Sequence, residues 1–359
     1  MKRTISLLLS LLISSSYLFP ATILFNVADK NKTPIKDADI IISKIENNRT
    51  IYIGEARTDS IGQCEINCPD DIKSFFSIIH PLYEPIKKYM NSNGSNKTIK
   101  VTLESRKSFS LLGYNVLKGF SNSDENKATF VNWIKTLSPD VILFQELNDF
   151  TEKSLREFAM RYGHQYAYIV KEDGYPCGIT SRLPISDFKK YTENLTHGYL
   201  HVKCQGIDIY ALHLNPHKAD VRKEEIAQII ADIKSLPKGA KILVEGDFNA
   251  FSLYDEKAYG PQFVTDRVAL NPKYKPNYEV TDSMLAIPLY DSFTKFSKRH
   301  FTKSFPTNAI KSKNKGCRFD YIFLSKDLYN KCTFANIIQD SVTNIISDHY
   351  PNFITINIK

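Results

Sequence analysis

A chain of 359 residues is longer than a single hydrophobic core usually serves, and its hydrophobic fraction of 42% argues against overall disorder. We therefore expect two folded domains. The 47 Lys and Arg residues outnumber the 39 Asp and Glu residues, which gives a net charge of +8. A charge of this size attracts anionic substrates without amounting to a dedicated nucleic-acid surface.

The first residues have the pattern of an export signal. Met1-Lys2-Arg3 is a charged start, residues 5–13 are mostly apolar, and serines follow at 14–16. We expect a signal peptide over residues 1–21, and export to the periplasm, the extracellular space or the cell surface. A membrane span needs about 20 continuous apolar residues, and the serines come too early for one, although an uncleaved anchor is the alternative. We expect no transmembrane anchor after signal cleavage.

Export would place the six cysteines in an oxidising compartment, where disulfides can form. Their spacing reveals no disulfide framework. If Cys64 and Cys68 share one strand, a rise of about 3.3 Å per residue separates them by about 13 Å, which is too far for a bridge. We expect the cysteines to be buried small side chains.

Residues 22–104 contain short apolar segments that alternate with polar turns, a pattern typical of an all-β sandwich. The segments 34–38, 58–62 and 80–84 resemble the carboxypeptidase regulatory-like module found beside many exported enzymes. We find no catalytic constellation in this part of the chain. The lone His80 is interpreted as structural.

After a polar joint at residues 105–108 the pattern changes to strands that alternate with helices, which predicts an α/β domain over residues 108–359. We expect helices over residues 126–137 and from about 220 to 236, although the charged start of the second could be a loop. The expected strands are 109–116, 141–147, 241–244, 320–324, 333–338 and 353–358.

Several of these strands end in polar residues that packing alone does not require. The ends of strands are where α/β proteins assemble their sites. In chain order the polar groups are Asn115, Glu146, His213, Asp247 with Asn249, Asp320, and Asp348 with His349.

Taken together and in this order, the motifs resemble the endonuclease/exonuclease/phosphatase superfamily, which shares the fold of deoxyribonuclease I. The resemblance spans about residues 108–359. It implies a four-layer α/β/β/α sandwich, here preceded by the small all-β sandwich. It also implies a hydrolase that cleaves phosphoester bonds with a bound Mg²⁺ or Mn²⁺.

The resemblance implies metal binding by Asn115, Glu146 and Asp348. Amide and carboxylate oxygens are the hard ligands that suit Mg²⁺. The alternatives are a turn residue for Asn115, a half-exposed carboxylate for Glu146 and a capping residue for Asp348.

The resemblance implies catalytic roles for five residues. On an extended chain, Asp247 and Asn249 would point to the same side and hold one attacking water; the alternative is an Asx turn. His349 would exchange a proton with that water or bind a phosphate oxygen, with Asp320, or alternatively Asp348, as its orienting partner. His213 would contact the scissile phosphate or protonate the leaving oxygen, unless it is a core histidine.

The implied mechanism is in-line attack by an activated water on phosphorus.

The substrate stays open between nucleic acid, phospholipid and small phosphodiesters. Residues 313–320 lack the pattern of inositol polyphosphate 5-phosphatases, and Cys317 stands where abasic-site endonucleases typically place Trp. Residues 251–290, rich in Tyr and Pro, could form a wall of the substrate cleft. The alternative from another class is a catalytically inactive binding protein whose β-sandwich is an adhesion or docking module. Oligomeric state is not predicted.

Overall fold

The computed structural model describes residues 21–46, 49–68, 73–80, 82–91, 96–256, 277–296, 302–312 and 316–358. The predicted signal peptide lies outside these ranges except for Ala21, which begins the first strand. The middle of the Tyr- and Pro-rich segment, residues 257–276, also lies outside them. Across the described ranges, the longest apolar helices fall short of what a bilayer crossing requires.

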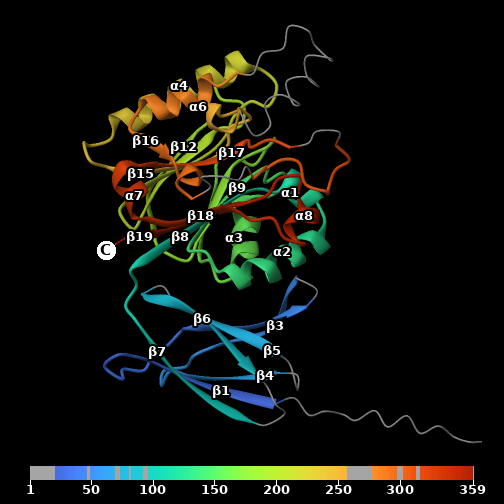
Figure 1. Ribbon diagram of the computed structural model, residues 1–359, viewed down its shortest axis with the longest axis vertical. Helices are drawn as coiled ribbons and strands as arrows, with labels where there is room; N and C mark the ends of the chain where they lie inside the picture. The colour runs from blue at the N-terminus through green and yellow to red at the C-terminus, as the bar shows by residue number, and fades with distance from the viewer. Residues whose placement is uncertain are drawn as a thin grey trace, which may run out of the picture.

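The N-terminal part is a β-sandwich of two sheets, drawn in blue to cyan in Figure 1. Strand β1 buries every second residue, including Ile23, Phe25 and Val27, which is the alternation that predicts a half-buried strand. Phe25 packs edge-on against Phe76 of the other sheet at 5.2 Å between ring centroids. The sheets have the orders β4-β1-β7 and β3-β2-β5-β6. The strands are β1 (Ala21–Asp29), β2 (Asp39–Glu46), β3 (Arg49–Arg57), β4 (Gln63–Cys68), β5 (Lys73–His80), β6 (Tyr83–Asn91) and β7 (Lys97–Leu103).

Two six-stranded sheets form the centre of the C-terminal part. The first has the order β10-β11-β9-β8-β19-β18 and consists of β8 (Ser108–Asn115), β9 (Val141–Gln145), β10 (Tyr166–Ile169), β11 (Gly178–Ser181), β18 (Cys332–Ile337) and β19 (Asn352–Asn357). The second has the order β12-β13-β14-β15-β17-β16 and consists of β12 (Ile185–Tyr191), β13 (Tyr199–Cys204), β14 (Ile207–His213), β15 (Lys241–Asp247), β16 (Leu289–Asp291) and β17 (Asp320–Ser325).

Helices cover the outer face of each sheet (Figure 1). Phe130 and Trp133 of α2 and Phe158 of α3 pack on the first sheet, while Ile229 of α4 and Met284 of α6 pack on the second. The helical segments are α1 (Leu117–Ser121), α2 (Asp124–Leu137), α3 (Glu152–Met160), α4 (Ala219–Ser235), η1 (Leu253–Asp255), α6 (Glu279–Ala286), η2 (Ser292–Lys295), α7 (Lys326–Lys331) and α8 (Thr343–Ile346).

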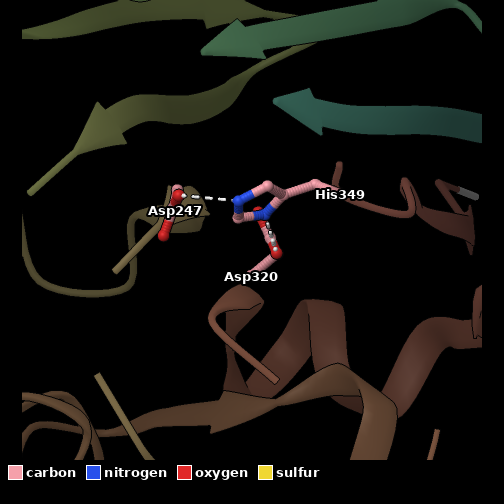
Figure 2. A group of neighbouring side chains, drawn as sticks. All are labelled: Asp247, Asp320 and His349. Carbon is pink, nitrogen blue, oxygen red and sulfur yellow. Dashed lines mark hydrogen bonds and ion pairs between the residues drawn. The ribbon is translucent and has the colours of Figure 1, made fainter. Parts of the chain in front are cut away.

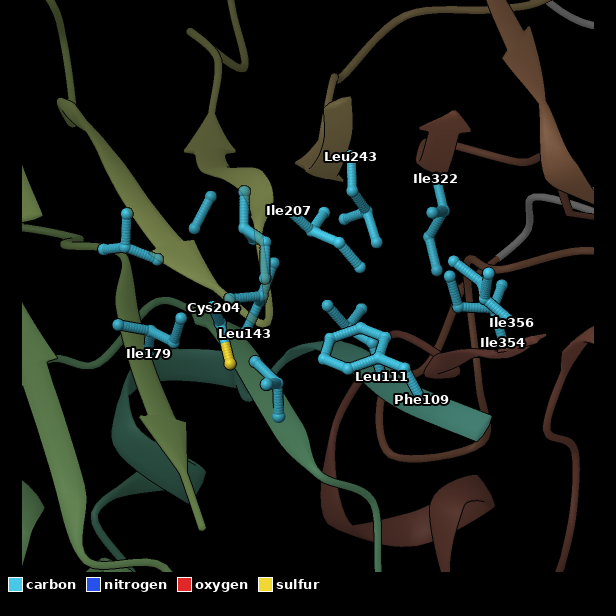
Figure 3. Close-up of a cluster of buried hydrophobic side chains, with 14 of the residues drawn as sticks. Phe109, Leu111, Leu143, Ile179, Cys204, Ile207, Leu243, Ile322, Ile354 and Ile356 are labelled. Atoms are coloured by element: carbon cyan, nitrogen blue, oxygen red, sulfur yellow. The ribbon is translucent and has the colours of Figure 1, made fainter. Parts of the chain in front are cut away.

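The two sheets face each other across an apolar layer (Figure 3). Phe109 and Leu111 of β8 meet Ile207, Leu243 and other apolar side chains of the opposite sheet. The order of layers is therefore α/β/β/α, and the four-layer fold predicted from the sequence is confirmed.

Most of the expected elements are present with small shifts at their ends. The expected strand 141–147 stops at Gln145 because Glu146 has a φ of 61°, in the left-handed region. The charged residues 220–225 belong to α4, as the helical interpretation required. Ser123 caps α2 by accepting a hydrogen bond from the backbone N–H of Asn126.

Polar contacts link the sandwich, and Arg106 in the joint that follows it, to the C-terminal part of the chain. The guanidinium of Arg106 pairs with Asp140 at 2.5 Å, and both side chains are almost fully buried. The Lys135 ammonium on α2 reaches Glu55 of β3 at 2.8 Å. His80, interpreted as structural, accepts a hydrogen bond at Nδ1 from the N–H of Leu82.

Candidate active site

The site lies at one end of the layer between the two sheets. Along a strand, alternate residues face this layer, and at this end the inward positions change from apolar to polar. In β15 the inward sequence is Leu243, Glu245, Asp247, and in β8 Leu111 is followed by Gly113 and Asn115. The change occurs at the same end of both sheets, so the polar side chains converge.

Strand register brings the predicted residues side by side. His213 of β14 pairs with Asp247 of β15, and Asp247 pairs in turn with Asp320 of β17. In the other sheet Asn115 pairs with Gln145, the residue before Glu146. Residues as far apart in sequence as His213 and Asp320 thus lie at the same end of neighbouring strands in one sheet.

Asp247, His349 and Asp320 form the centre of the site (Figure 2). The imidazole of His349 lies between the two carboxylates, with Nδ1 at 2.8 Å from Asp320 Oδ2 and Nε2 at 3.6 Å from Asp247 Oδ2. All three side chains are buried. Asp320, and not Asp348, therefore holds Nδ1 of this histidine.

Burial and charge act in opposite directions on these groups. Burial raises the pKa of Asp247 to about 7, although the neighbouring His349 works to lower it. Burial works to lower the pKa of His349, but the carboxylates of Asp320 and Asp247 outweigh it and raise this pKa well above its ordinary value. The pKa values of Asp247 and His349 are therefore set by burial and by their mutual charge.

Asn115 and Glu146 lie beside this cluster. The Asn115 amide donates from Nδ2 to Glu146 Oε1 and to Asp247 Oδ2, at 3.2 Å in each case. The left-handed turn α1 wraps around Glu146: the N–H of Lys118 donates to Glu146 Oε2 at 3.0 Å, and the N–H of Gly119 donates to the Glu146 carbonyl oxygen at 2.7 Å. Backbone donors thus fix the Glu146 carboxylate at the edge of the cleft.

This donor set fits a hard divalent cation. The partly positive NH₂ group of the Asn115 amide lies between the carboxylates of Glu146 and Asp247. A bound cation at this position would contact the same two carboxylate oxygens. Asn115 Oδ1 accepts from the N–H of Leu117 at 3.1 Å, so ligation through this oxygen requires the amide to turn. Glu146 needs no such change, since its carboxylate already faces the cleft.

The extended geometry expected for Asp247 and Asn249 is wrong. The strand ends at Asp247, Asn249 has a φ of 47°, and its N–H donates to Asp247 Oδ1 at 2.9 Å, which is an Asx turn. The short side chain of Asn tolerates this left-handed conformation. Both side chains still line the cleft, so the turn and a role at the site are compatible.

His213 is buried and lies beside Asp247, with 3.8 Å between Nε2 and Asp247 Oδ2. Burial and the neighbouring His197 and His349 hold its pKa well below the ordinary value. Three groups therefore converge on Asp247 Oδ2: the Asn115 amide, His213 and His349.

A cleft of about 300 Å³ opens at this point. It contains five residues to which no role was assigned from the sequence: Tyr175, Thr196, His197, Asn215 and His217. Its lining comprises Glu146, Tyr175, Thr196, His197, His213, Asn215, Pro216, His217, Asp247, Asn249 and His349.

Asp348 is not among the described residues that line this cleft. Its carboxylate is half-buried, and Oδ1 has no hydrogen-bond partner among the described residues. Its negative charge helps to raise the pKa of both His349 and Tyr114. Metal ligation by Asp348 stays a prediction.

Glu245 lies directly beneath the site and is fully buried. Its Oε2 accepts a hydrogen bond from the side chain of Gln145 at 2.9 Å. Burial raises the pKa of this carboxyl well above its ordinary value. Gly113 leaves the space that Glu245 occupies, because a Cβ at Gly113 would lie 1.8 Å from Glu245 Oε1 and 2.1 Å from Cδ.

We expect Gly113→Ala to destabilise the protein by about 1–3 kcal/mol, the usual cost of overpacking a core, and to lower activity by displacing Glu245, Gln145 and the adjacent Glu146. Thermal unfolding and turnover measure the two effects. Gly54→Ala is the matched control, since a Cβ there meets its nearest atom at 3.5 Å, an ordinary contact. Equal stability of the two variants would contradict this account of Gly113.

Sequence comparison agrees with this geometry. A model of the endonuclease/exonuclease/phosphatase family matches residues 112–349, which includes every strand end described above. The chain belongs to this family. Family membership supports hydrolysis of phosphoester bonds as the class of reaction. No curated protein sequence matches the chain significantly.

Solved structures share the fold of this endonuclease/exonuclease/phosphatase domain at low sequence identity. An AP endonuclease from Archaeoglobus fulgidus is 17% identical with a TM-score of 0.54, over 69% of this chain and 99% of that one. A 3'-5' exonuclease from Neisseria meningitidis is 17% identical with a TM-score of 0.53, over 69% and 100%. D. rerio TDP2 complexed with single-strand DNA product is 18% identical with a TM-score of 0.51, over 70% and 100%. At these identities the likeness shows the fold alone.

Proposed function

We propose that the protein is an exported, divalent-metal-dependent phosphoester hydrolase of the phosphodiesterase or nuclease type. The observation that carries this proposal is the buried Asp320–His349–Asp247 arrangement, with the Glu146 carboxylate and the Asn115 amide beside it. The cleft of about 300 Å³ that adjoins Asp247 and His349 distinguishes this arrangement from a packed core histidine.

In the proposed mechanism, Asp247 and Asn249 hold the attacking water at the floor of the cleft. Asp320 fixes the ring of His349 through Nδ1, which leaves Nε2 to exchange a proton with that water or to donate to a phosphate oxygen. His213 faces the same phosphate from the end of the neighbouring strand β14 and stabilises the charge that develops on its oxygens. A hard cation held by Glu146, Asn115 and Asp348 would neutralise phosphate charge.

For the substrate, we propose a phosphodiester, with nucleic acid as the first class to test. D. rerio TDP2 was solved with a single-strand DNA product, and a net charge of +8 suits an anionic polymer. Phospholipids and small phosphodiesters are the other members of the class. Export rests on the charged and apolar start of the sequence, and immunodetection of the protein outside the cytoplasm would test it.

Purified protein with Mg²⁺ or Mn²⁺ should hydrolyse at least one of bis-p-nitrophenyl phosphate, DNA, RNA and sphingomyelin. Failure on the whole panel would support the alternative, an inactive binding protein with a docking sandwich. The panel also ranks the three substrate classes.

We expect EDTA to abolish this turnover and added Mg²⁺ or Mn²⁺ to restore it. Glu146→Ala should lower kcat by at least about 100-fold, because it removes a carboxylate oxygen from a hard-cation site. Glu224→Ala, which removes an exposed carboxylate on α4, is the control and should be fully active. Full activity in EDTA, or of Glu146→Ala, would refute metal dependence through this residue.

A further inference from the structure

His197 lines the same cleft, although no sequence pattern singles it out. Its ring stacks on that of His213, with 4.3 Å between centroids and 21° between planes. The ring of Tyr175 also packs edge-on against that of His197, with 5.6 Å between centroids and 70° between planes. The side chain is only 7% exposed. Two histidines thus lie in parallel at one wall of the cleft.

The Nε2 atom of the His197 ring is buried and lacks a hydrogen-bond partner among the described residues. A buried polar atom without a partner destabilises the folded protein, and such atoms call for an explanation. Because this atom lies in the wall of a cleft beside a catalytic histidine, a bound ligand that supplies the missing hydrogen-bond partner is the most direct explanation.

The loop that carries His197 is held in place from several directions. The carboxylate of Glu225, buried on α4, accepts from the N–H of Thr196 at 2.7 Å and from the N–H of Asn215 at 2.8 Å. The Asn215 amide donates to Thr196 Oγ1 at 3.0 Å. Gly198 follows with a φ of 81°, and a Cβ there would lie 2.7 Å from the carbonyl oxygen of Tyr191. The position of His197 is therefore built before any substrate arrives.

We propose that His197 is a substrate-binding residue whose Nε2–H donates a hydrogen bond to a non-bridging oxygen of the phosphate that His213 also faces. This inference rests on the proposed phosphoester hydrolase function. Burial, with Lys171 and His217 nearby, lowers the pKa of His197 to about 4, so the ring is a neutral hydrogen-bond donor near neutral pH. It supplies binding without taking part in the exchange of protons at His349.

Dimethyl phosphate, a phosphodiester that hydrolyses very slowly, is the probe for binding. Titrated into protein labelled with ¹⁵N-histidine, it should shift the Nε2 resonance of His197. His197→Phe keeps an aromatic ring for the stack on His213 but removes the nitrogen, and should weaken dimethyl phosphate binding at least tenfold. Turnover of bis-p-nitrophenyl phosphate should show KM raised to a similar extent and kcat within about threefold of wild type, the signature of lost uniform binding.

His201→Phe is the matched control, because His201 is also buried and stacked on a ring, that of Tyr210 at 4.3 Å, but does not line the cleft as described. It should bind dimethyl phosphate as wild type does. Wild-type affinity in His197→Phe, or an Nε2 resonance that does not move, would overturn the proposal and leave His197 with a stacking role. If wild type turns over no phosphoester, the proposed function fails, while the dimethyl phosphate titration still decides the role of His197.

Discussion

His349→Ala should lower kcat on any phosphoester substrate by about 10³-fold in protein that remains folded. Positioned general acid–base groups typically contribute about 10²–10⁴-fold, and this imidazole is the group that Asp320 and Asp247 hold from both sides. Steady-state turnover of bis-p-nitrophenyl phosphate measures the loss. Thermal unfolding of the variant shows whether the fold is intact.

The chain offers a closely matched control for this variant. His201 is buried and also lies between two carboxylates, with Nε2 at 3.0 Å from Asp208 and Nδ1 at 3.6 Å from Asp232. It packs between the second sheet and α4, away from the residues that line the cleft. The His201→Ala protein that remains folded should keep most of the wild-type turnover. A folded His349→Ala variant with wild-type turnover would remove His349 from the mechanism.

The sequence predicted the fold and most of the site because both depend on patterns along single strands. A buried apolar run that stops at Asp247 or His213 is visible in the sequence, and parallel register then brings such ends together. Asn115 and Glu146 were found in the same way. The pairing of Asp320 with His349 came from the family resemblance, and the structure places these two side chains at 2.8 Å.

What the sequence did not predict depends on loops and on backbone conformation. For Asp247 and Asn249 the sequence left an extended pair and an Asx turn as alternatives, and only the positive φ of Asn249 and its hydrogen bond to Asp247 decide for the turn. His197 lies between strands, so no apolar run ends at it. The Thr196-His197-Gly198 sequence offered one signal, a glycine at a turn directly before a buried strand. Its place beside His213 follows only from the three-dimensional packing.

Arg318 is a further residue whose role the sequence only partly predicts. Its residue type indicates pairing with carboxylates, but the sequence does not show which carboxylates. Arg318 stands two residues before Asp320, and on an extended strand both side chains would lie on one face, where an arginine can orient carboxylates. In the structure its guanidinium pairs with Asp255 at 2.8 Å and Asp291 at 2.6 Å, from η1 and β16. It thus ties the segments on either side of residues 257–276 to the start of β17, behind the site and not in it.

Arg318→Met should destabilise the protein by about 3–5 kcal/mol, the usual cost of removing one partner from a buried ion pair. Arg318 is 1% exposed, and its loss leaves two buried carboxylates without their counter-ion. Urea denaturation followed by the fluorescence of Trp133, the only tryptophan, measures the free energy of unfolding of this domain.

Two comparisons separate the ion pair from the simple loss of a side chain. Arg318→Met combined with Asp255→Asn and Asp291→Asn should recover much of the lost stability, since no buried charge then stands alone. Lys223→Met breaks an exposed pair with Glu279, with both side chains more than half exposed, and should cost less than about 1 kcal/mol. If the triple variant is no more stable than Arg318→Met, the loss comes from packing against Phe293 and Tyr321, whose rings lie at 4.8 and 4.4 Å from the guanidinium, and not from unpaired charge.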